Sequence, residues 1–278
     1  MDSALETSPA GTPQETVAAR LARAQELQHD NNLSGAVREL EAAYAQMQAT
    51  PYQVEFKTHV QLVIDLAAAY LKTNELGKAR HVLEREAAFA EKIFQIMQAT
   101  GTPHQKREAA AGRVQLRDRA SQVALLGMGA PEISIKRWIK GEPATLSSLR
   151  GQVVLLEFWA TWCKPCREMF KKLKELDEAH GARGLEIVAI TRHYLAERNN
   201  AQSKADELTL MRNTIEEQGI KFRVGVAEDE GLQELYGAIG LPTLALIDRR
   251  GIVRYAHFGG GPDSDFENLL DECLKELA

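Results

Sequence analysis

Two of the three cysteines of this chain stand in the segment LLEFWATWCKPCREMF, residues 155–170. Cys163 and Cys166 are separated by two residues, follow an apolar run, and precede a segment rich in Lys, Glu and Leu. A CxxC pair of this kind is found in zinc sites, in structural disulfides and in redox-active dithiols. The sequence around the pair decides among these three uses.

A zinc site is disfavoured because its other ligands are missing. A structural zinc ion needs four Cys or His ligands, usually from two separated pairs. The sequence has no second CxxC, and His180, His193 and His257 are scattered without ligand spacing. We therefore expect no metal site.

A purely structural disulfide is also disfavoured, since closing so short a loop removes little entropy from the unfolded chain. A redox pair must lie where a strand runs into a helix. The apolar run VVLLEFWA, 153–160, is typical of a buried strand, and residues 163–180 form an amphipathic helical pattern. Cys163 would then lie at a helix N-terminus, where unpaired N–H groups and the macrodipole favour a thiolate.

The third cysteine, Cys273, lies in the C-terminal segment DFENLLDECLKELA. It shares one face of a predicted helix with five apolar residues: Phe266, Leu269, Leu270, Leu274 and Leu277. A buried, unreactive thiol is the expected role of Cys273.

The composition is that of an ordinary folded protein. The 278 residues suggest about two domains, and 44% are hydrophobic and 26% charged. The net charge of −5 provides no basic surface for nucleic acid, and no apolar run reaches the roughly 20 residues of a membrane span. Residues 1–15 have neither the basic nor the apolar part of a signal peptide, and we expect a flexible tail there.

Residues 16–125 are rich in Ala, Leu, Glu, Gln and Arg and predict an all-α domain. Small and large apolar residues recur at the same offsets around the turns HDNNLSG and LKTNELG, which predicts two helical hairpins. The positions are Ala24, Leu27, Asn31, Leu33, Ala36, Leu40 and Ala43 in the first, and Ala67, Tyr70, Asn74, Leu76, Ala79 and Leu83 in the second. They resemble tetratricopeptide (TPR) repeats, although Ala36 and Ala79 are 43 residues apart against a usual period of about 34. An irregular helical bundle is the alternative.

Residues 126–278 alternate between strand and helix patterns. Strands are expected in EISIKRWI, VVLLEFWA, GLEIVAIT, IKFRVGV, TLALID and GIVRYAHFG, and helices in 163–180, DELTLMRNTIEEQG, EGLQELYGAIG and the C-terminal segment. KGEPATLSSLRGQ predicts turns plus a short helix, and RHYLAERNNAQSKAD a solvated loop. The order predicts an α/β domain in which helices cover both faces of a mixed central sheet.

Two segments of this half resemble the thioredoxin superfamily. VVLLEFWATWCKPCREM is similar to the thioredoxin active-site segment, including Trp159 and Trp162. YGAIGLPTLALIDRRGIVRY is similar to the segment that carries the cis-proline, here Pro242. The preceding GAPEISIKRWIKGEPATLSSLRG is closer to the TlpA/ResA-like branch. The resemblance covers residues 128–278 and implies a thioredoxin-like fold, a thiol–disulfide oxidoreductase, and no cofactor besides a redox-active Cys163–Cys166 disulfide.

The same resemblance implies roles for individual residues. Cys163 matches the nucleophile that attacks a substrate disulfide, and Cys166 the resolving thiol that displaces the product. Glu157 matches a buried carboxylate that takes the proton of Cys166, and Pro242 would lie against the disulfide. The substrate-binding candidates are Trp162, Lys164, Pro165, Leu241 and Thr243.

One position departs from the family pattern. TlpA/ResA-like proteins tend to carry a Glu six residues after the first cysteine and a proline shortly afterwards. Met169 holds that position here, Glu168 stands one residue early, and FKKLKEL has no proline. The second carboxylate of the family is thus absent or displaced.

Two other functions remain open at this point. A peroxiredoxin usually has a Thr three residues before its reactive cysteine and a Pro upstream, whereas Thr161 is only two residues before Cys163 and LLEFWATW has no proline. A TPR-type interaction protein with a secondary redox domain is the other alternative. We favour reduction of protein disulfides.

The expected partners are a protein or small-molecule disulfide substrate and an upstream thiol reductant, with a protein partner on the helical domain as a further option. The resemblance implies a periplasmic or extracytoplasmic location, and a cytoplasmic one stays open.

Overall fold

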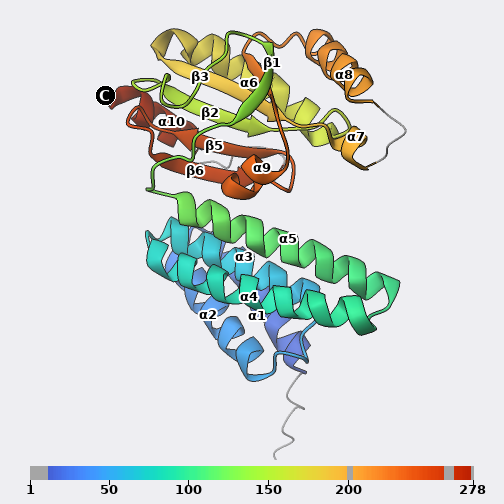
Figure 1. The fold of residues 1–278 in the computed structure, drawn as a ribbon. Helices are drawn as coiled ribbons and strands as arrows, with labels where there is room; N and C mark the ends of the chain where they lie inside the picture. The colour runs from blue at the N-terminus through green and yellow to red at the C-terminus, as the bar shows by residue number, and fades with distance from the viewer. Residues whose placement is uncertain (1–11, 199–202, 260–265, 277–278) are drawn as a thin grey trace, which may run out of the picture. The chain divides into compact units, whose positions relative to one another are not determined.

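The computed structural model describes residues 12–198, 203–259 and 266–276. The chain divides into two compact units between Ala120 and Ser121, within the last helix of the N-terminal half (Figure 1). The sequence placed the domain boundary between residues 125 and 126. Within the described residues, none of the helices is both long and apolar enough to cross a membrane.

The first unit is built from helices. Their bounds are α1 (Pro13–His29), α2 (Leu33–Ala49), α3 (Phe56–Lys72), α4 (Leu76–Thr100) and α5 (Pro103–Leu125), the last of which ends in the second unit. Helix α1 begins at Pro13, inside the segment expected to be a tail, because Thr12 and Glu15 form a reciprocal capping box.

The turns of the two hairpins, α1–α2 and α3–α4, are built alike. Asn31 and Asn74 adopt left-handed backbone conformations, with φ of 57° and 60°. In each turn the N–H group of the following residue donates a hydrogen bond of 2.7 Å to a carbonyl in the last turn of the preceding helix. Asn32 donates to the Leu27 carbonyl and Glu75 to the Tyr70 carbonyl. The prediction of two similar helical hairpins is therefore confirmed.

A buried carboxylate joins three of these helices. Glu86 of α4 is 2% exposed and accepts hydrogen bonds from Tyr44 Oη (2.6 Å) and Gln48 Nε2 (2.9 Å) of α2. His59 Nε2 of α3 lies 2.6 Å from its other oxygen. Burial by itself raises the pKa of Glu86, but these hydrogen bonds outweigh burial and lower it.

The second unit contains a six-stranded mixed sheet in the order β1-β4-β3-β2-β5-β6. Its strands are β1 (Ile135–Lys140), β2 (Val153–Phe158), β3 (Leu185–Thr191), β4 (Arg223–Ala227), β5 (Thr243–Ile247) and β6 (Val253–Phe258). β3 runs parallel to β2 and β4, and the other pairs are antiparallel. The fold is the thioredoxin-like α/β arrangement that the sequence predicts.

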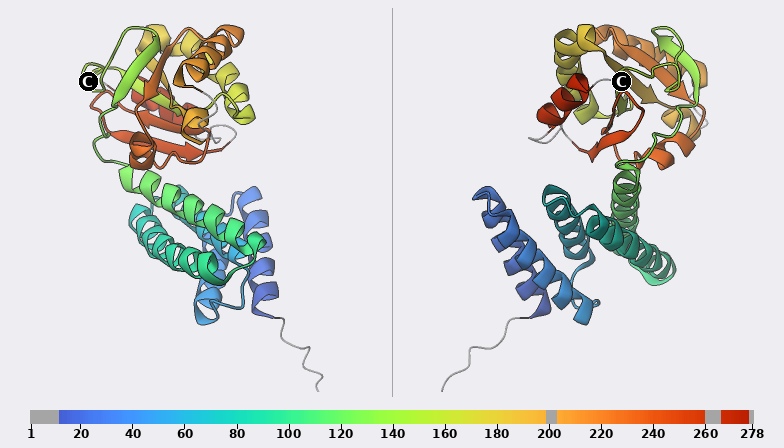
Figure 2. Two further views of the ribbon diagram at one scale, coloured as in Figure 1. Left: turned by 45° about the vertical axis from the view of Figure 1, so that its right-hand side comes forward. Right: turned by 90° about the vertical axis from the view of Figure 1, so that its left-hand side faces the viewer.

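Helices cover both faces of this sheet (Figure 2). Helices α6 (Lys164–His180), α8 (Lys204–Glu217) and α10 (Phe266–Lys275) contribute to the apolar core on one face. Helix α9 (Gly231–Tyr236) and the turns that carry Leu146 and Leu149 contribute to the core on the other. Cys273 is fully buried in the first core as a free thiol, as expected.

The sequence predicted a short helix between β1 and β2. This prediction is wrong, because the segment forms turns without a helix. Glu132 accepts the N–H groups of Leu146 (2.6 Å) and Ser147 (3.1 Å). Thr145 and Ser148 also bond to each other through side chain and backbone. These hydrogen bonds satisfy the first N–H groups of the segment and hold the turn in place.

Candidate active site

The cysteine pair lies where β2 meets α6. Every residue of β2 is buried, and the chain then turns so that Cys163 is the N-cap of α6. Cys163 and Cys166 are joined by a disulfide, and the Cys163 Sγ accepts the Cys166 N–H at 3.2 Å. Cys163 is 4% exposed and Cys166 is 0% exposed. The predicted position at a strand–helix junction is confirmed.

The residues beside the pair differ sharply in exposure. Lys164 and Pro165, in the first turn of α6, are exposed, and Trp162 is 50% exposed. Trp159 is fully buried and meets the ring of Phe170 edge-on, with the centroids 5.1 Å apart. Trp162 therefore stands at the surface beside the disulfide, whereas Trp159 belongs to the core.

Glu157 faces the same core as the cysteines. Side chains alternate along β2, so Leu155, Glu157 and Trp159 share one face, and Leu155 and Trp159 belong to the cluster that includes both cysteines. Glu157 is 0% exposed, and neither carboxylate oxygen has a hydrogen-bond partner in the described part of the chain. Burial raises the pKa of Glu157 well above its usual value. This carboxyl is therefore a stronger proton acceptor than an ordinary glutamate.

The predicted cis-proline segment lies at the same end of the sheet as the cysteines, where β2 ends and β5 begins. Strand β5 pairs with β2 so that Thr243 lies opposite Phe158, the last residue before the active-site segment. The peptide between Leu241 and Pro242 is cis. The Thr243 hydroxyl donates to the Gly240 carbonyl at 2.8 Å and bridges this turn. The register therefore brings residues 241–243 and the cysteine segment together.

The segment after β3 is ordered, and its prediction as a solvated loop is wrong for the described residues; 199–202 lie outside them. Helix α7 (Tyr194–Arg198) begins there, and Tyr194 is only 6% exposed. The Tyr194 ring meets Trp162 edge-on at 5.6 Å between centroids. Burial raises the pKa of Tyr194 to about 12. Tyr194 thus supports the tryptophan beside the disulfide.

A hydrogen-bond network holds Tyr194 in place. Gln233 Nε2, from α9, donates to Tyr194 Oη at 2.5 Å and to the Ala238 carbonyl at 2.9 Å. Arg192 Nε donates to Gln233 Oε1 at 2.6 Å. Buried Glu207 of α8 accepts the two N–H groups of residues 195 and 196 at the start of α7. Gln233 therefore links the segment after β3 to the segment that leads to Pro242.

Sequence reasoning missed Tyr194 and Gln233 as parts of the site. The only local signal is an aromatic residue three positions after the end of a buried strand, in a largely polar segment.

Glu168 is exposed on α6, while Met169 is 4% exposed and belongs to the core with the cysteines. Glu168 does not take the inward position. Among the described residues, no group of three or more His, Cys, Asp or Glu side chains is arranged to hold a metal ion.

Comparison with known proteins gives matches to the second unit. Residues 126–256 match the sequence profile of the AhpC/TSA family. A crystal structure of a thiol:disulfide interchange protein of the thioredoxin family from Chlorobium tepidum TLS is 28% identical, covers 52% of this chain and 95% of its own, and has a TM-score of 0.42.

Two bacterial relatives show the family. Thioredoxin-like protein YneN of Bacillus subtilis (strain 168) is 30% identical over 52% of this chain and 78% of its own length. Thiol-disulfide oxidoreductase ResA of Bacillus thuringiensis (strain Al Hakam) is 32% identical over 52% of this chain and 76% of its own. The chain belongs to the thioredoxin-like thiol–disulfide oxidoreductases. The helical unit of this oxidoreductase lies outside the matched part.

Proposed function

We propose that this oxidoreductase reduces protein disulfides through the Cys163–Cys166 couple. The observation that carries the proposal is the position of the bonded pair at the N-terminus of α6, on the same core as a buried carboxyl group that has no hydrogen-bond partner among the described residues. A helix N-terminus stabilises a thiolate on Cys163, and Lys164 adds a positive charge beside it.

The reaction begins from the reduced pair. The Cys163 thiolate attacks one sulfur of the substrate disulfide, forms a mixed disulfide and expels the other substrate sulfur as a thiolate. Glu157 takes the proton of Cys166, whose thiolate then attacks the Cys163 sulfur. This step releases the second substrate sulfur and forms the Cys163–Cys166 disulfide. An upstream dithiol returns two electrons and two protons to begin the next cycle.

The surface around the pair offers contacts for an extended substrate. Trp162 presents an apolar ring beside the disulfide, and Pro165 fixes the first turn of α6. Pro242 has no N–H, so the backbone of the partly buried Leu241 before it is left to pair with a substrate segment. We assign Trp162, Lys164, Pro165 and Leu241 to substrate binding. The sequence also suggested Thr243, but Thr243 is fully buried between β2 and β6 and supports the turn instead.

Trapping the mixed disulfide tests this proposal. Reduced Cys166→Ser protein, mixed with a peptide that contains a disulfide, should accumulate a covalent adduct on Cys163 that dithiothreitol releases. Cys163→Ser should form none. Cys273→Ser is the matched control, because its thiol is buried and burial raises its pKa to about 11. It should react like the natural protein, and an adduct on Cys273 or none on Cys163 would overturn the proposal.

The AhpC/TSA match favours a second candidate, a thiol peroxidase. In that reaction the Cys163 thiolate attacks hydrogen peroxide, becomes a sulfenic acid and releases water; Cys166 then forms the disulfide and releases a second water. The absence of the usual Thr and Pro before Cys163 argues against peroxidase as the main activity. Peroxide consumption faster than reduction of a protein disulfide would favour the peroxidase.

A further inference from the structure

The helical unit contains a cavity that results from the unequal lengths of its helices. Helix α3 has 17 residues and its antiparallel neighbour α4 has 25. His59, near the start of α3, stacks on Phe89 of α4 at 4.8 Å between ring centroids. From Phe89 to its end at Thr100, α4 extends about 16 Å further. The start of α5 lines the same space, which α3 does not fill.

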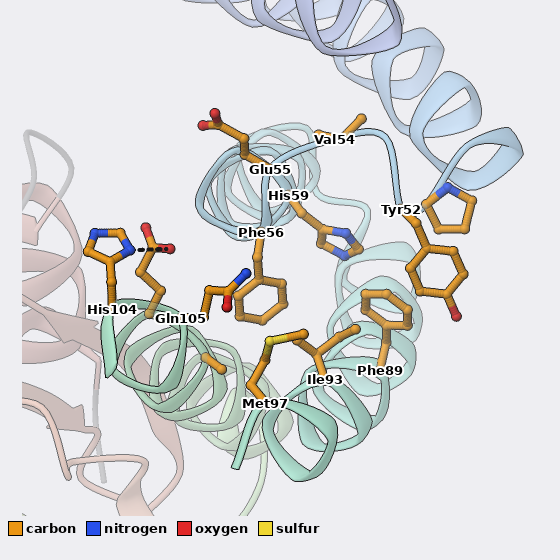
Figure 3. Close-up of a pocket in the computed structure, with 13 residues that line it drawn as sticks. Tyr52, Val54, Glu55, Phe56, His59, Phe89, Ile93, Met97, His104 and Gln105 are labelled. Carbon is orange, nitrogen blue, oxygen red and sulfur yellow. Dashed lines mark ion pairs between the residues drawn. The ribbon is translucent and has the colours of Figure 1, made fainter. Parts of the chain in front are cut away.

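The cavity has a volume of about 530 Å³, within the range of roughly 300–1,000 Å³ that is usual for ligand sites. Figure 3 shows apolar side chains gathered in its middle and polar ones around them. The apolar lining includes Phe56, Phe89, Ile93, Met97 and Ala109.

The inner side of the cavity is closed by close helix packing. A Cβ placed on Gly112 of α5 would lie 2.5 Å from Cε1 of Phe56, so α5 touches α3 there. The outer side stays open, since Ile93 and Met97 are only partly buried and Tyr52 is 81% exposed. Apolar surface left open at a cavity is typical of a binding site. The exposed Tyr52 extends the apolar contact beyond the cavity, which suits a chain segment better than a small enclosed ligand.

The charged groups of the lining are mainly acidic. Glu55 and Glu108 contribute carboxylates, and Glu108 lies 3.2 Å from Nδ1 of His104. Within the described ranges, no Lys or Arg lines the cavity. A ligand with positive charge beside its apolar part would complement this rim.

We propose that this cavity binds a basic peptide segment of a partner protein. One aromatic or long aliphatic side chain enters between Phe56 and Met97, and an adjacent Lys or Arg pairs with Glu55 or Glu108. The chemistry differs from that of the disulfide site and does not depend on it.

The proposal is tested by measuring binding of a labelled hexapeptide by fluorescence anisotropy. The peptide alternates lysine and leucine, and phenylalanine replaces its central leucine. The full-length natural protein should bind it, and the same peptide with glutamate in place of lysine should not bind. Met97→Gln keeps the side-chain length but puts an amide against the apolar lining, and should weaken binding about tenfold. Ile96→Gln is the matched control, because Ile96 is 49% exposed and does not line the cavity, and should bind as the natural protein does.

A second test neutralises the two acidic residues at the rim of the cavity, Glu55 and Glu108, and leaves its apolar lining unchanged. The double variant Glu55→Gln, Glu108→Gln should lose most of the salt dependence of binding. Cys163→Ser should still bind the peptide, so the outcome is distinct from that of the redox proposal. Equal binding by the Met97 and Ile96 variants, or preference for the glutamate peptide, would overturn the proposal. Self-association that Met97→Gln abolishes would identify a second copy as the occupant and also overturn it.

Discussion

Replacing Glu157 by Gln should make the thioredoxin-like unit more stable at neutral pH. Glutamine is close in shape to the protonated carboxyl group and cannot ionise. The folded-state pKa of Glu157 is raised by burial, and neither oxygen has a hydrogen-bond partner in the described residues. Folding must therefore keep a proton on a group that releases it at a pH of about 4.3 in the unfolded chain.

The sign and size of the effect follow from this proton. Below the unfolded pKa both states are protonated and Glu157 has no pH-dependent effect. As the pH rises above it, the free energy of unfolding falls by up to about 1.4 kcal/mol per pH unit until the folded carboxyl group ionises. Between pH 5 and pH 7 the natural protein should thus lose stability relative to Glu157→Gln, at a rate no steeper than this slope.

Urea unfolding of the oxidised protein, followed by tryptophan fluorescence from pH 4 to pH 8, measures this difference. All three tryptophans lie in the thioredoxin-like unit, so the signal reports that unit. Glu132→Gln is the matched control with the opposite sign. Burial raises the pKa of Glu132, but its hydrogen bonds outweigh burial and lower it, so this variant should be less stable at neutral pH and approach the natural protein in acid. Parallel curves for Glu157→Gln and the natural protein would refute the reasoning.

Three further perturbations have defined outcomes. Tyr194→Phe should lower the free energy of unfolding by about 1 kcal/mol, because the Gln233 hydrogen bond is lost, and should leave KM for a peptide disulfide unchanged in steady-state kinetics. Tyr194→Leu removes the ring that meets Trp162, so it should raise KM and shift the Trp162 emission spectrum. Glu86→Ala should destabilise the helical unit by about 3 kcal/mol in thermal unfolding followed by circular dichroism, since three polar side chains lose their shared acceptor. Lys164→Ala should raise the pKa of the reduced Cys163 thiol, measured by the pH dependence of alkylation, and an unchanged profile would exclude the charge effect.

The parts of the fold that the sequence predicts well have strong local signals. The buried run 153–160 and the amphipathic pattern after it place Cys163 at a helix N-terminus, which the structure confirms. The two helical hairpins are predicted because each turn has an Asn at the same offset, and Asn tolerates the left-handed backbone found there.

The parts that could not be predicted depend on contacts between distant segments. Tyr194 is buried and its hydroxyl accepts a hydrogen bond from Gln233, far along the chain, and no local pattern shows this. The turn before β2 forms because Glu132 accepts N–H groups of residues 146 and 147. The cavity of the helical unit depends on how far α4 and α5 extend past α3, and helix ends are poorly specified by periodicity.

The equilibrium reduction potential of the Cys163–Cys166 couple tests the central proposal most directly. Full-length protein is equilibrated in dithiothreitol and glutathione buffers, and the fraction of reduced cysteines is measured by mass after alkylation. A disulfide reductase should give a reversible two-electron couple near thioredoxin's value of about −270 mV. A value near −120 mV would indicate a protein that donates disulfides, and the absence of a reversible couple would contradict a redox role for the pair.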